Sequence, residues 1–146
     1  MADEQQDVLS PQQVCDVMVA NDNFSRWLGL VVEEMGAGYC RLSYTVREDM
    51  LNGFRSIHGG VLFSASDSAF AFSCNSHGII TVALDVSITF TRPAAVGDVL
   101  TVEAKELHLG GRTGLYDIRT TNQRGELVCV FKGTAYRTGK KVEDNR

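Results

Sequence analysis

The sequence predicts an α+β fold in which an antiparallel β-sheet packs around one long central helix. Three observations lead to this fold class. Residues 59–77 form an apolar helical segment with almost no charge, residues 79–91 alternate apolar and polar side chains, and further strand patterns follow at short intervals. A helix that is apolar on nearly all sides must be buried, and here only the surrounding strands can bury it.

The composition is that of a single globular domain. The 146 residues are 44% hydrophobic and 22% charged, which is enough apolar material for one core. We expect one domain over residues 10–138, with polar tails at residues 1–9 and 139–146. The net charge of −4 argues against a nucleic-acid partner, because phosphate binding needs a basic surface.

The start of the chain is acidic and polar, which is unlike a signal peptide. No stretch of the sequence requires a membrane span. We therefore expect a cytoplasmic protein with no membrane partner. Its 4 cysteines are expected to be reduced and to fill the core rather than act as nucleophiles.

The first helix has a clear start signal. Ser10 is expected as the N-cap, Pro11 as the first helical residue and Gln13 as the third, which is a capping-box arrangement. Apolar residues follow at helical spacing, and we expect the helix to end near residues 21–23. A second short helical turn is expected over residues 24–28.

Strand patterns dominate the rest of the chain. Residues 30–35 and 39–46 are expected to form a hairpin. Residues 79–91 show a period of two, which predicts a long strand with one buried face. The apolar members of that face are Ile80, Val82, Leu84, Val86, Ile88 and Phe90. Further strands are expected at residues 99–107, 114–121 and 127–136.

Asp67 is the only carboxylate of the apolar segment 59–77. Burying an unpaired carboxylate is costly, so this residue needs a partner or a purpose. In one interpretation it lies on a solvent-facing stripe with Ser64, Ser68 and Asn75. In the other it is a base or nucleophile at a pocket wall, with a pKa raised by desolvation.

His58, Gly59 and Gly60 come directly before this helix. Glycines leave the first backbone N–H groups uncovered, and a helix N-terminus attracts negative charge. The N–H of Gly59 or Gly60 is therefore a candidate donor to an oxyanion. The alternative is that the two glycines only form a tight turn into the helix.

Asp67 and Gly59 lie too far apart to serve one carbonyl from the same helix. They are eight residues apart, which is about 12 Å at ~1.5 Å per residue. If both act on one reacting group, they must come from different subunits. A twofold dimer with antiparallel central helices would bring them together.

The order of elements and one long motif identify a resemblance. The motif reads Asn52-Gly53-Phe54-Arg55-Ser56-Ile57-His58-Gly59-Gly60 and is followed by Ala65-Ser66-Asp67. It closely resembles the hotdog-fold acyl-CoA thioesterases, and in particular the PaaI-type branch of phenylacetate degradation. Residues 67–76, 90–93, 97–98 and 113–118 are similar to the same branch. The resemblance extends over residues 12–138.

This resemblance implies a role for each motif residue. The backbone N–H of Gly59 would polarise the thioester carbonyl, and Asp67 of the neighbouring subunit would activate water or attack the carbonyl itself. Asn52 would place the nucleophile or the thioester, and His58 would support the loop. Some relatives carry a hydroxyl residue on the next strand, where this chain has Ala83.

Binding residues follow from the same resemblance. The turn that contains Arg112 and Thr113 lies where relatives hold the phosphates of CoA, and Arg92 and Arg137 are further candidates. Each of these arginines could equally be a solvated surface residue. The apolar residues expected around the acyl group are Phe54, Leu62 and Phe63.

The sequence predicts neither a metal site nor an organic cofactor. Its histidines and cysteines lack the spacing of zinc ligands. A thioester already has a good leaving group, so an oxyanion donor and a positioned base are sufficient for hydrolysis.

The expected function is hydrolysis of an aryl-acetyl-type CoA thioester, such as hydroxyphenylacetyl-CoA, to the free acid and CoA. The expected assembly is a homo-oligomer with shared sites, a dimer at least and a homotetramer by resemblance. One alternative is a hotdog dehydratase that acts on hydroxyacyl thioesters. The other is a non-catalytic acyl-CoA binding module.

Overall fold

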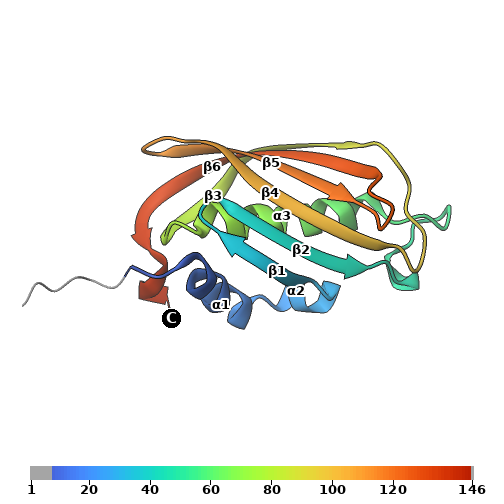
Figure 1. The fold of residues 1–146 in the computed structure, drawn as a ribbon, viewed down its shortest axis with the longest axis horizontal. Helices are drawn as coiled ribbons and strands as arrows, with labels where there is room; N and C mark the ends of the chain where they lie inside the picture. Colours follow the sequence, from blue (N-terminus) through green and yellow to red (C-terminus); the bar gives the residue numbers. More distant parts are fainter. Residues whose placement is uncertain (1–7, 146) are drawn as a thin grey trace, which may run out of the picture.

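The computed structural model describes residues 8–145 and confirms the α+β architecture. A six-stranded antiparallel sheet curves over the long helix α3, while α1 and α2 lie below the sheet (Figure 1). The elements are α1 (Pro11–Asn21), α2 (Asn23–Leu28), β1 (Val31–Gly36), β2 (Tyr39–Thr45), the 3-10 helix η1 (Glu48–Met50), α3 (Gly59–Asn75), β3 (Ile79–Phe90), β4 (Val99–Leu109), β5 (Thr113–Thr121), β6 (Leu127–Lys141) and the 3-10 helix η2 (Val142–Asn145).

The strand order in the sheet is β1-β2-β4-β5-β6-β3. Sequential strands pair as hairpins, with the exception of β3, which crosses the molecule to pair with β6. The two edges of the sheet are therefore β1 and β3.

Capping residues mark both N-terminal helices, and the N-cap of the first is the one that the sequence predicts. The Gln13 N–H donates to Ser10 Oγ at 3.2 Å, and the Ser10 N–H donates to Gln13 Oε1 at 2.8 Å. This reciprocal pair confirms the capping box of α1. The second helix ends at Gly29, whose φ of 77° is the left-handed conformation that favours glycine at a helix end.

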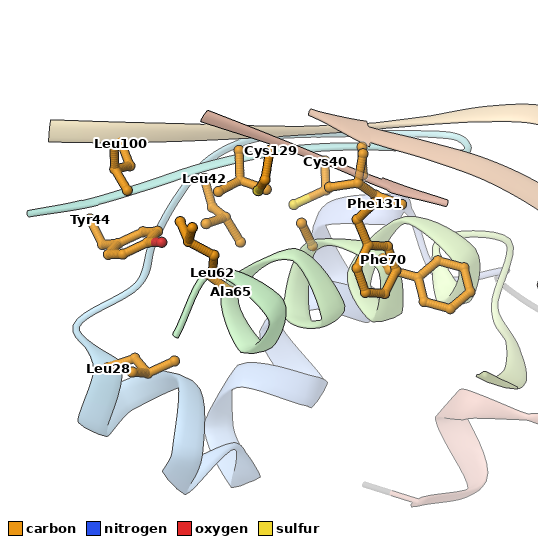
Figure 2. Packing of buried hydrophobic residues seen from close by; sticks show 14 of the residues in the cluster. Leu28, Cys40, Leu42, Tyr44, Leu62, Ala65, Phe70, Leu100, Cys129 and Phe131 are labelled. Atoms are coloured by element: carbon orange, nitrogen blue, oxygen red, sulfur yellow. The ribbon is translucent and has the colours of Figure 1, made fainter. Parts of the chain in front are cut away.

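The core lies between α3 and the inner face of the sheet (Figure 2). Leu42, Tyr44 and Leu100 point from the sheet toward the first turns of α3. At the other end, the Phe70 ring of α3 lies 5.8 Å from the ring of Phe131. Gly133 permits this close approach, because a Cβ there would lie 2.7 Å from the Phe70 ring. All four cysteines are buried in this core, as expected.

The long strand β3 differs from its prediction. Its apolar residues were expected to be buried, but Val82 is 49% exposed, Leu84 62% and Phe90 52%. The strand lies at an edge of the sheet, so one side has no neighbouring strand among residues 8–145. Its register with β6 also shifts between Ala83 and Asp85. The apolar pattern therefore marks a surface that a single chain leaves uncovered.

The carboxyl-terminal boundary also differs from the expectation. Residues 139–141 belong to β6, and η2 follows directly, so this segment is part of the fold rather than a polar tail. Val142 is buried against Leu9 and Val14, and its N–H donates to the carbonyl of Gly78 at 2.9 Å. Val142 thus anchors the otherwise polar segment 139–145 to the rest of the fold. Residues 1–7 and 146 of the two expected tails lie outside the described residues.

Within residues 8–145, each helix is too short or too polar to cross a bilayer. In the same part of the chain, no three His, Cys, Asp or Glu side chains gather as they would around a metal ion.

Candidate active site

The N-terminus of α3 presents one free backbone donor. His58 is the N-cap, and its Nδ1 accepts the N–H of Gly60 at 2.8 Å. The N–H groups of Val61 and Leu62 donate to the His58 carbonyl at 2.9 and 3.4 Å. The Gly59 N–H has no hydrogen-bond partner among the described residues. A free N–H at a helix N-terminus is suited to bind a negatively charged oxygen.

At both glycines an added Cβ would meet a neighbouring side chain closely. A Cβ at Gly59 would lie 3.0 Å from Cζ of Phe90, and a Cβ at Gly60 would lie 2.9 Å from Nδ1 of His58. Gly60 therefore allows the histidine cap. Gly59 allows the end of β3 to pack against the first turn of α3.

Asn52 organises the loop that precedes this helix. Its Oδ1 accepts the N–H of Phe54 at 2.9 Å and that of Ser56 at 3.2 Å. Because two donors fix Oδ1, the amide group Nδ2 faces away from them, and within residues 8–145 it has no hydrogen-bond partner. Asn52 can therefore donate a hydrogen bond to a ligand, but its acceptor is already used.

Several predicted residues meet in one hollow of about 420 Å³, here named the Gly59 hollow. Its lining includes Asn52, Ser56, Gly59, Leu62, Thr91 and Arg92. The Arg92 guanidinium pairs with Glu126 at 3.0 Å, so this cation is already partly neutralised. The two free donors, Gly59 N–H and Asn52 Nδ2, therefore belong to residues of the same hollow.

Asp67 lies in a second, separate cavity of about 450 Å³, here named the Asp67 cavity. Residues of α1, α3, β3 and η2 line it, among them Met18, Phe70 and Val142. No described residue forms a hydrogen bond or an ion pair with the Asp67 carboxylate. Burial raises the pKa of this carboxyl. An unpaired carboxylate in an apolar wall has the character of a catalytic base or nucleophile.

The structure removes Asn75 from the expected solvent-facing stripe, whereas Asp67, Ser64 and Ser68 are each half-buried. Asn75 is only 6% exposed, and its side chain bonds to the backbone of Thr81. The Ser64 hydroxyl donates to the Gly60 carbonyl at 2.7 Å, and the Ser68 hydroxyl pairs with Ser25 at 2.8 Å. The small polar residues of α3 thus bond within the fold, and Asp67 remains without such a bond.

A third hollow of about 500 Å³, the Arg112 hollow, brings together two of the predicted arginines. Arg137 donates its backbone N–H to the carbonyl of Arg112 at 2.7 Å, and its guanidinium donates to the Gly110 carbonyl at 3.3 Å. The Arg112 guanidinium makes no hydrogen bond or ion pair within the described part of the chain. Thr113 closes the adjacent turn, because its carbonyl accepts the N–H of Gly110 at 2.7 Å.

The three apolar residues expected around the acyl group lie in different environments. Leu62 lines the Gly59 hollow. Phe63 packs its ring at 5.3 Å from that of Phe131 and lines none of the three hollows. Phe54 is 94% exposed at the tip of the Asn52 loop. A single chain therefore does not bring these residues together around one pocket.

Comparison with known proteins decides the family. Residues 54–129 match the model of the Thioesterase superfamily. The chain belongs to the thioesterase superfamily.

Named relatives of this thioesterase include the acyl-coenzyme A thioesterase PaaI of Escherichia coli, which is 42% identical over 130 residues, 89% of this chain and 93% of that protein. The solved structure of E. coli PaaI, from the phenylacetic acid degradation operon, has a TM-score of 0.88 at 41% identity and covers 90% of this chain and 95% of its own. The hotdog fold expected from the sequence is thereby confirmed.

A second solved structure is that of a hypothetical thioesterase from Streptococcus pneumoniae with coenzyme A. It has a TM-score of 0.74 at 31% identity and covers 77% of this chain and 90% of its own. Human acyl-coenzyme A thioesterase 13 is 29% identical over 133 residues, 87% of this chain and 94% of that protein.

Further residues line these hollows that the sequence did not point to. Phe90 packs against Gly59 and lines the Gly59 hollow. Val17 and Met18 of α1 line the Asp67 cavity. In the sequence they are only apolar residues at helical spacing, and a pattern on one helix does not show which cavity that helix lines.

Proposed function

We propose that this thioesterase hydrolyses acyl-CoA thioesters, with aryl-acetyl groups such as hydroxyphenylacetyl as the preferred acyl class. One observation carries the proposal: α3 holds both a free N–H at Gly59 and an unpaired, half-buried carboxylate at Asp67. An oxyanion donor and a base are the two groups that thioester hydrolysis needs. The similarity to PaaI supports CoA thioesters as the substrates.

The complete site is formed by two subunits. Gly59 and Asp67 line different hollows and lie about 12 Å apart along one helix. The exposed apolar residues of the edge strand β3 are suited to pair with β3 of a second copy. Antiparallel pairing of these edges brings Asp67 of one subunit toward Gly59 of the other.

The same pairing places the phosphate contacts. The Arg112 hollow includes Ile79, at the first residue of β3, whereas the Gly59 hollow includes Phe90, at its last. Because a strand rises about 3.3 Å per residue, these ends are roughly 36 Å apart in one chain. In an antiparallel pair, each start of β3 lies near the end of the partner's β3. Arg112 and Arg137 would then hold CoA phosphates near the partner's Gly59.

The reaction follows from these positions. The Gly59 N–H holds the thioester oxygen, which becomes negative as the carbonyl carbon is attacked. In the base route, Asp67 takes a proton from the attacking water. The C–S bond then breaks, and the thiolate of CoA receives the proton. In the nucleophile route, Asp67 attacks the carbon, expels CoA and forms an anhydride that water hydrolyses. Both routes yield the free acid and CoA.

Two further residues position these groups. Asn52 donates its free Nδ2–H to the water or the thioester, since its Oδ1 is held by the loop. His58 holds Gly60 and thereby fixes the direction of the Gly59 N–H. No metal or organic cofactor takes part in either route, so activity should survive exhaustive dialysis against a chelator.

The test is release of free thiol from a panel of CoA thioesters, with phenylacetyl, hydroxyphenylacetyl, acetyl and decanoyl groups. We expect the highest kcat/KM for the aryl-acetyl members. Binding of these thioesters without thiol release would indicate a non-catalytic binding module. Loss of water from a hydroxyacyl-CoA, detected by absorbance of the new double bond, would indicate a dehydratase. Mass measurement in solution should show a dimer or a tetramer of this chain, which we place in the cytoplasm.

A further inference from the structure

We infer that the acyl group of the substrate is bound in the Asp67 cavity, where α1 and η2 determine which acyl groups fit. This inference rests on the proposed function and deepens it. It moves the acyl group away from the surroundings of Phe54, Leu62 and Phe63, which the structure does not bring together.

The Asp67 cavity has the size and chemistry of a pocket for an apolar group. Its volume of about 450 Å³ lies within the range of roughly 300–1,000 Å³ that is typical of small-molecule sites. Asp67 is the one charged residue in its lining, and the remaining walls are largely apolar. Burial raises the pKa of the Cys74 thiol to about 12, so Cys74 adds no charge to the wall at neutral pH.

The polar residues that α3 and β3 add to the wall, apart from Asp67, already have hydrogen-bond partners. The Nδ2 of Asn75 donates to the carbonyls of Ala71 and Thr81, and its Oδ1 accepts the N–H of Thr81 at 2.8 Å. The hydroxyl of Thr81 donates to the carbonyl of Ile79 at 2.8 Å. Among the residues of α3 and β3 that line the cavity, Asp67 is therefore the only charged one. Its carboxylate has no hydrogen-bond partner among the described residues.

The two substituents of a thioester differ in what they require. The pantetheine arm of CoA carries amide groups that need hydrogen-bond partners, and the Gly59 hollow offers Asn52, Thr91 and Arg92. An aryl or alkyl group needs only apolar walls. With the carbonyl held between Gly59 of one subunit and Asp67 of the other, the acyl group therefore extends into the Asp67 cavity.

Two segments near the chain ends contribute to the lining of this cavity. They supply Val17 and Met18 from α1 and Val142 from η2. Figure 1 shows η2 beside α1, and the two helices are in contact. Both segments lie outside residues 54–129, which match the superfamily model. Part of the cavity lining therefore comes from outside the segment that matches the superfamily model.

The inference is tested by filling the cavity from two sides. Val17→Phe narrows it from α1, and Ala71→Leu narrows it from α3. Val19→Phe is the matched control, because Val19 is on the same helix, is 41% exposed and does not line the cavity. For each protein, kcat/KM is measured with acetyl-CoA, phenylacetyl-CoA and decanoyl-CoA, and thermal unfolding and solution mass are recorded.

We expect both filling variants to lower the phenylacetyl-to-acetyl ratio of kcat/KM by about tenfold or more, because small volume changes in an apolar pocket have effects of this size. Val19→Phe should leave the ratio unchanged. A third variant, Met18→Ala, enlarges the cavity and should raise the decanoyl-to-phenylacetyl ratio. The ratios of kcat/KM are compared only for variants that fold. If Val17→Phe does not fold, Ala71→Leu carries the test, and the reverse also holds.

The outcomes separate this inference from the proposed function. If the wild-type chain releases thiol but both filling variants keep the wild-type ratios, the acyl group lies elsewhere, and only the present inference fails. If a filling variant dissociates the oligomer instead, the cavity holds part of the second subunit, which also overturns it. If the wild-type chain releases no thiol from any thioester, the proposed function fails first.

Discussion

The Nδ1 atom of His58 lies 2.8 Å from the backbone nitrogen of Gly60 and accepts its N–H. This bond settles two points about the site. The proton of the neutral imidazole must be on Nε2, because Nδ1 is the acceptor. In addition, the N–H of Gly60 is not free to bind a ligand. Among the described residues at the start of α3, the unpaired N–H is that of Gly59.

His58 is therefore expected to act as a positioning residue. His58→Ala should lower kcat and should cost about 0.5–2 kcal/mol of folding stability, as loss of an N-cap usually does. His58→Asn should restore both, since Asn is a preferred N-cap. The measurements are thiol release and chemical denaturation. Restored stability together with activity as low as that of the alanine variant would give the imidazole itself a chemical role.

Asp67→Asn is expected to abolish turnover and to stabilise the fold. Removal of the base should lower kcat by about 100-fold or more. Burial raises the pKa of Asp67, so the ionised form is disfavoured in the folded chain. Stability linked to this group is present while it is protonated and is lost as pH rises through the raised pKa. The asparagine variant should therefore have the higher Tm at neutral pH, and the difference should shrink in acid.

The pH profile of the wild-type enzyme checks the same assignment. Because Asp67 acts in its ionised form, kcat/KM should rise with pH, with a midpoint above that of an ordinary aspartate. Asp16→Asn, at an exposed position of α1, is the matched control and should keep the wild-type rate and profile. Turnover of Asp67→Asn within tenfold of wild type would remove Asp67 from the mechanism.

Gly59→Ala is expected to impair catalysis by displacing the oxyanion donor. The new Cβ would lie 3.0 Å from Cζ of Phe90, so either the ring or the first turn of α3 must move. Displacement of a donor by as little as ~1 Å can cost up to about 100-fold in rate. The double variant Gly59→Ala/Phe90→Leu should recover part of kcat. In Gly36→Ala, the added Cβ makes only an ordinary contact at 3.5 Å, and this control should be fully active.

The regular elements could be predicted from the sequence because each carries its own local signal. The capping box at Ser10, the apolar helix after Gly59 and the period-two pattern after Gly78 all led to elements within a few residues of their observed bounds. The position of β3 in the sheet was not predictable in this way. It depends on pairing with β6, which is distant in sequence, and so the exposure of Leu84 was missed.

The candidate site was predictable in its residue types and less so in its geometry. Gly59 and Asn52 line one hollow, but which of their groups is free depends on hydrogen bonds that only the folded loop shows. A pocket wall at Asp67 was one of the two interpretations, but the contribution of α1 to that pocket was missed, because α1 lies in another part of the chain. Cavities formed by distant segments leave no local pattern.

Arg112→Ala is expected to raise KM with little change in kcat. The Arg112 guanidinium has no partner among the described residues, and phosphate contacts bind ground and transition states alike. The effect should weaken as salt is added, because counterions screen the interaction. Arg119→Ala, on the outer face of β5 and paired with Asp117 at 3.0 Å, is the control. An unchanged KM at low salt would place the phosphates of CoA elsewhere.

Subunit sharing can be tested by mixing two inactive variants, Asp67→Asn and Asn52→Ala. In a shared site, Asp67 comes from one subunit and Asn52 from the other, since the two residues line different hollows within a chain. A heterodimer therefore has one intact site and one site with both lesions. Random exchange gives about half heterodimers. Because each heterodimer regains one of its two sites, roughly a quarter of wild-type activity should return, assuming independent sites.

The control for this mixture is each variant exchanged with itself under the same conditions, which should stay inactive. Formation of heterodimers is verified by mass, with a tag on one of the two variants. Residues of a site within one chain would never be reunited by exchange. If heterodimers form and activity does not return, Gly59 and Asp67 do not serve one thioester from opposite subunits. The distance of about 12 Å between them along α3 would then require that only one of the two takes part in the reaction.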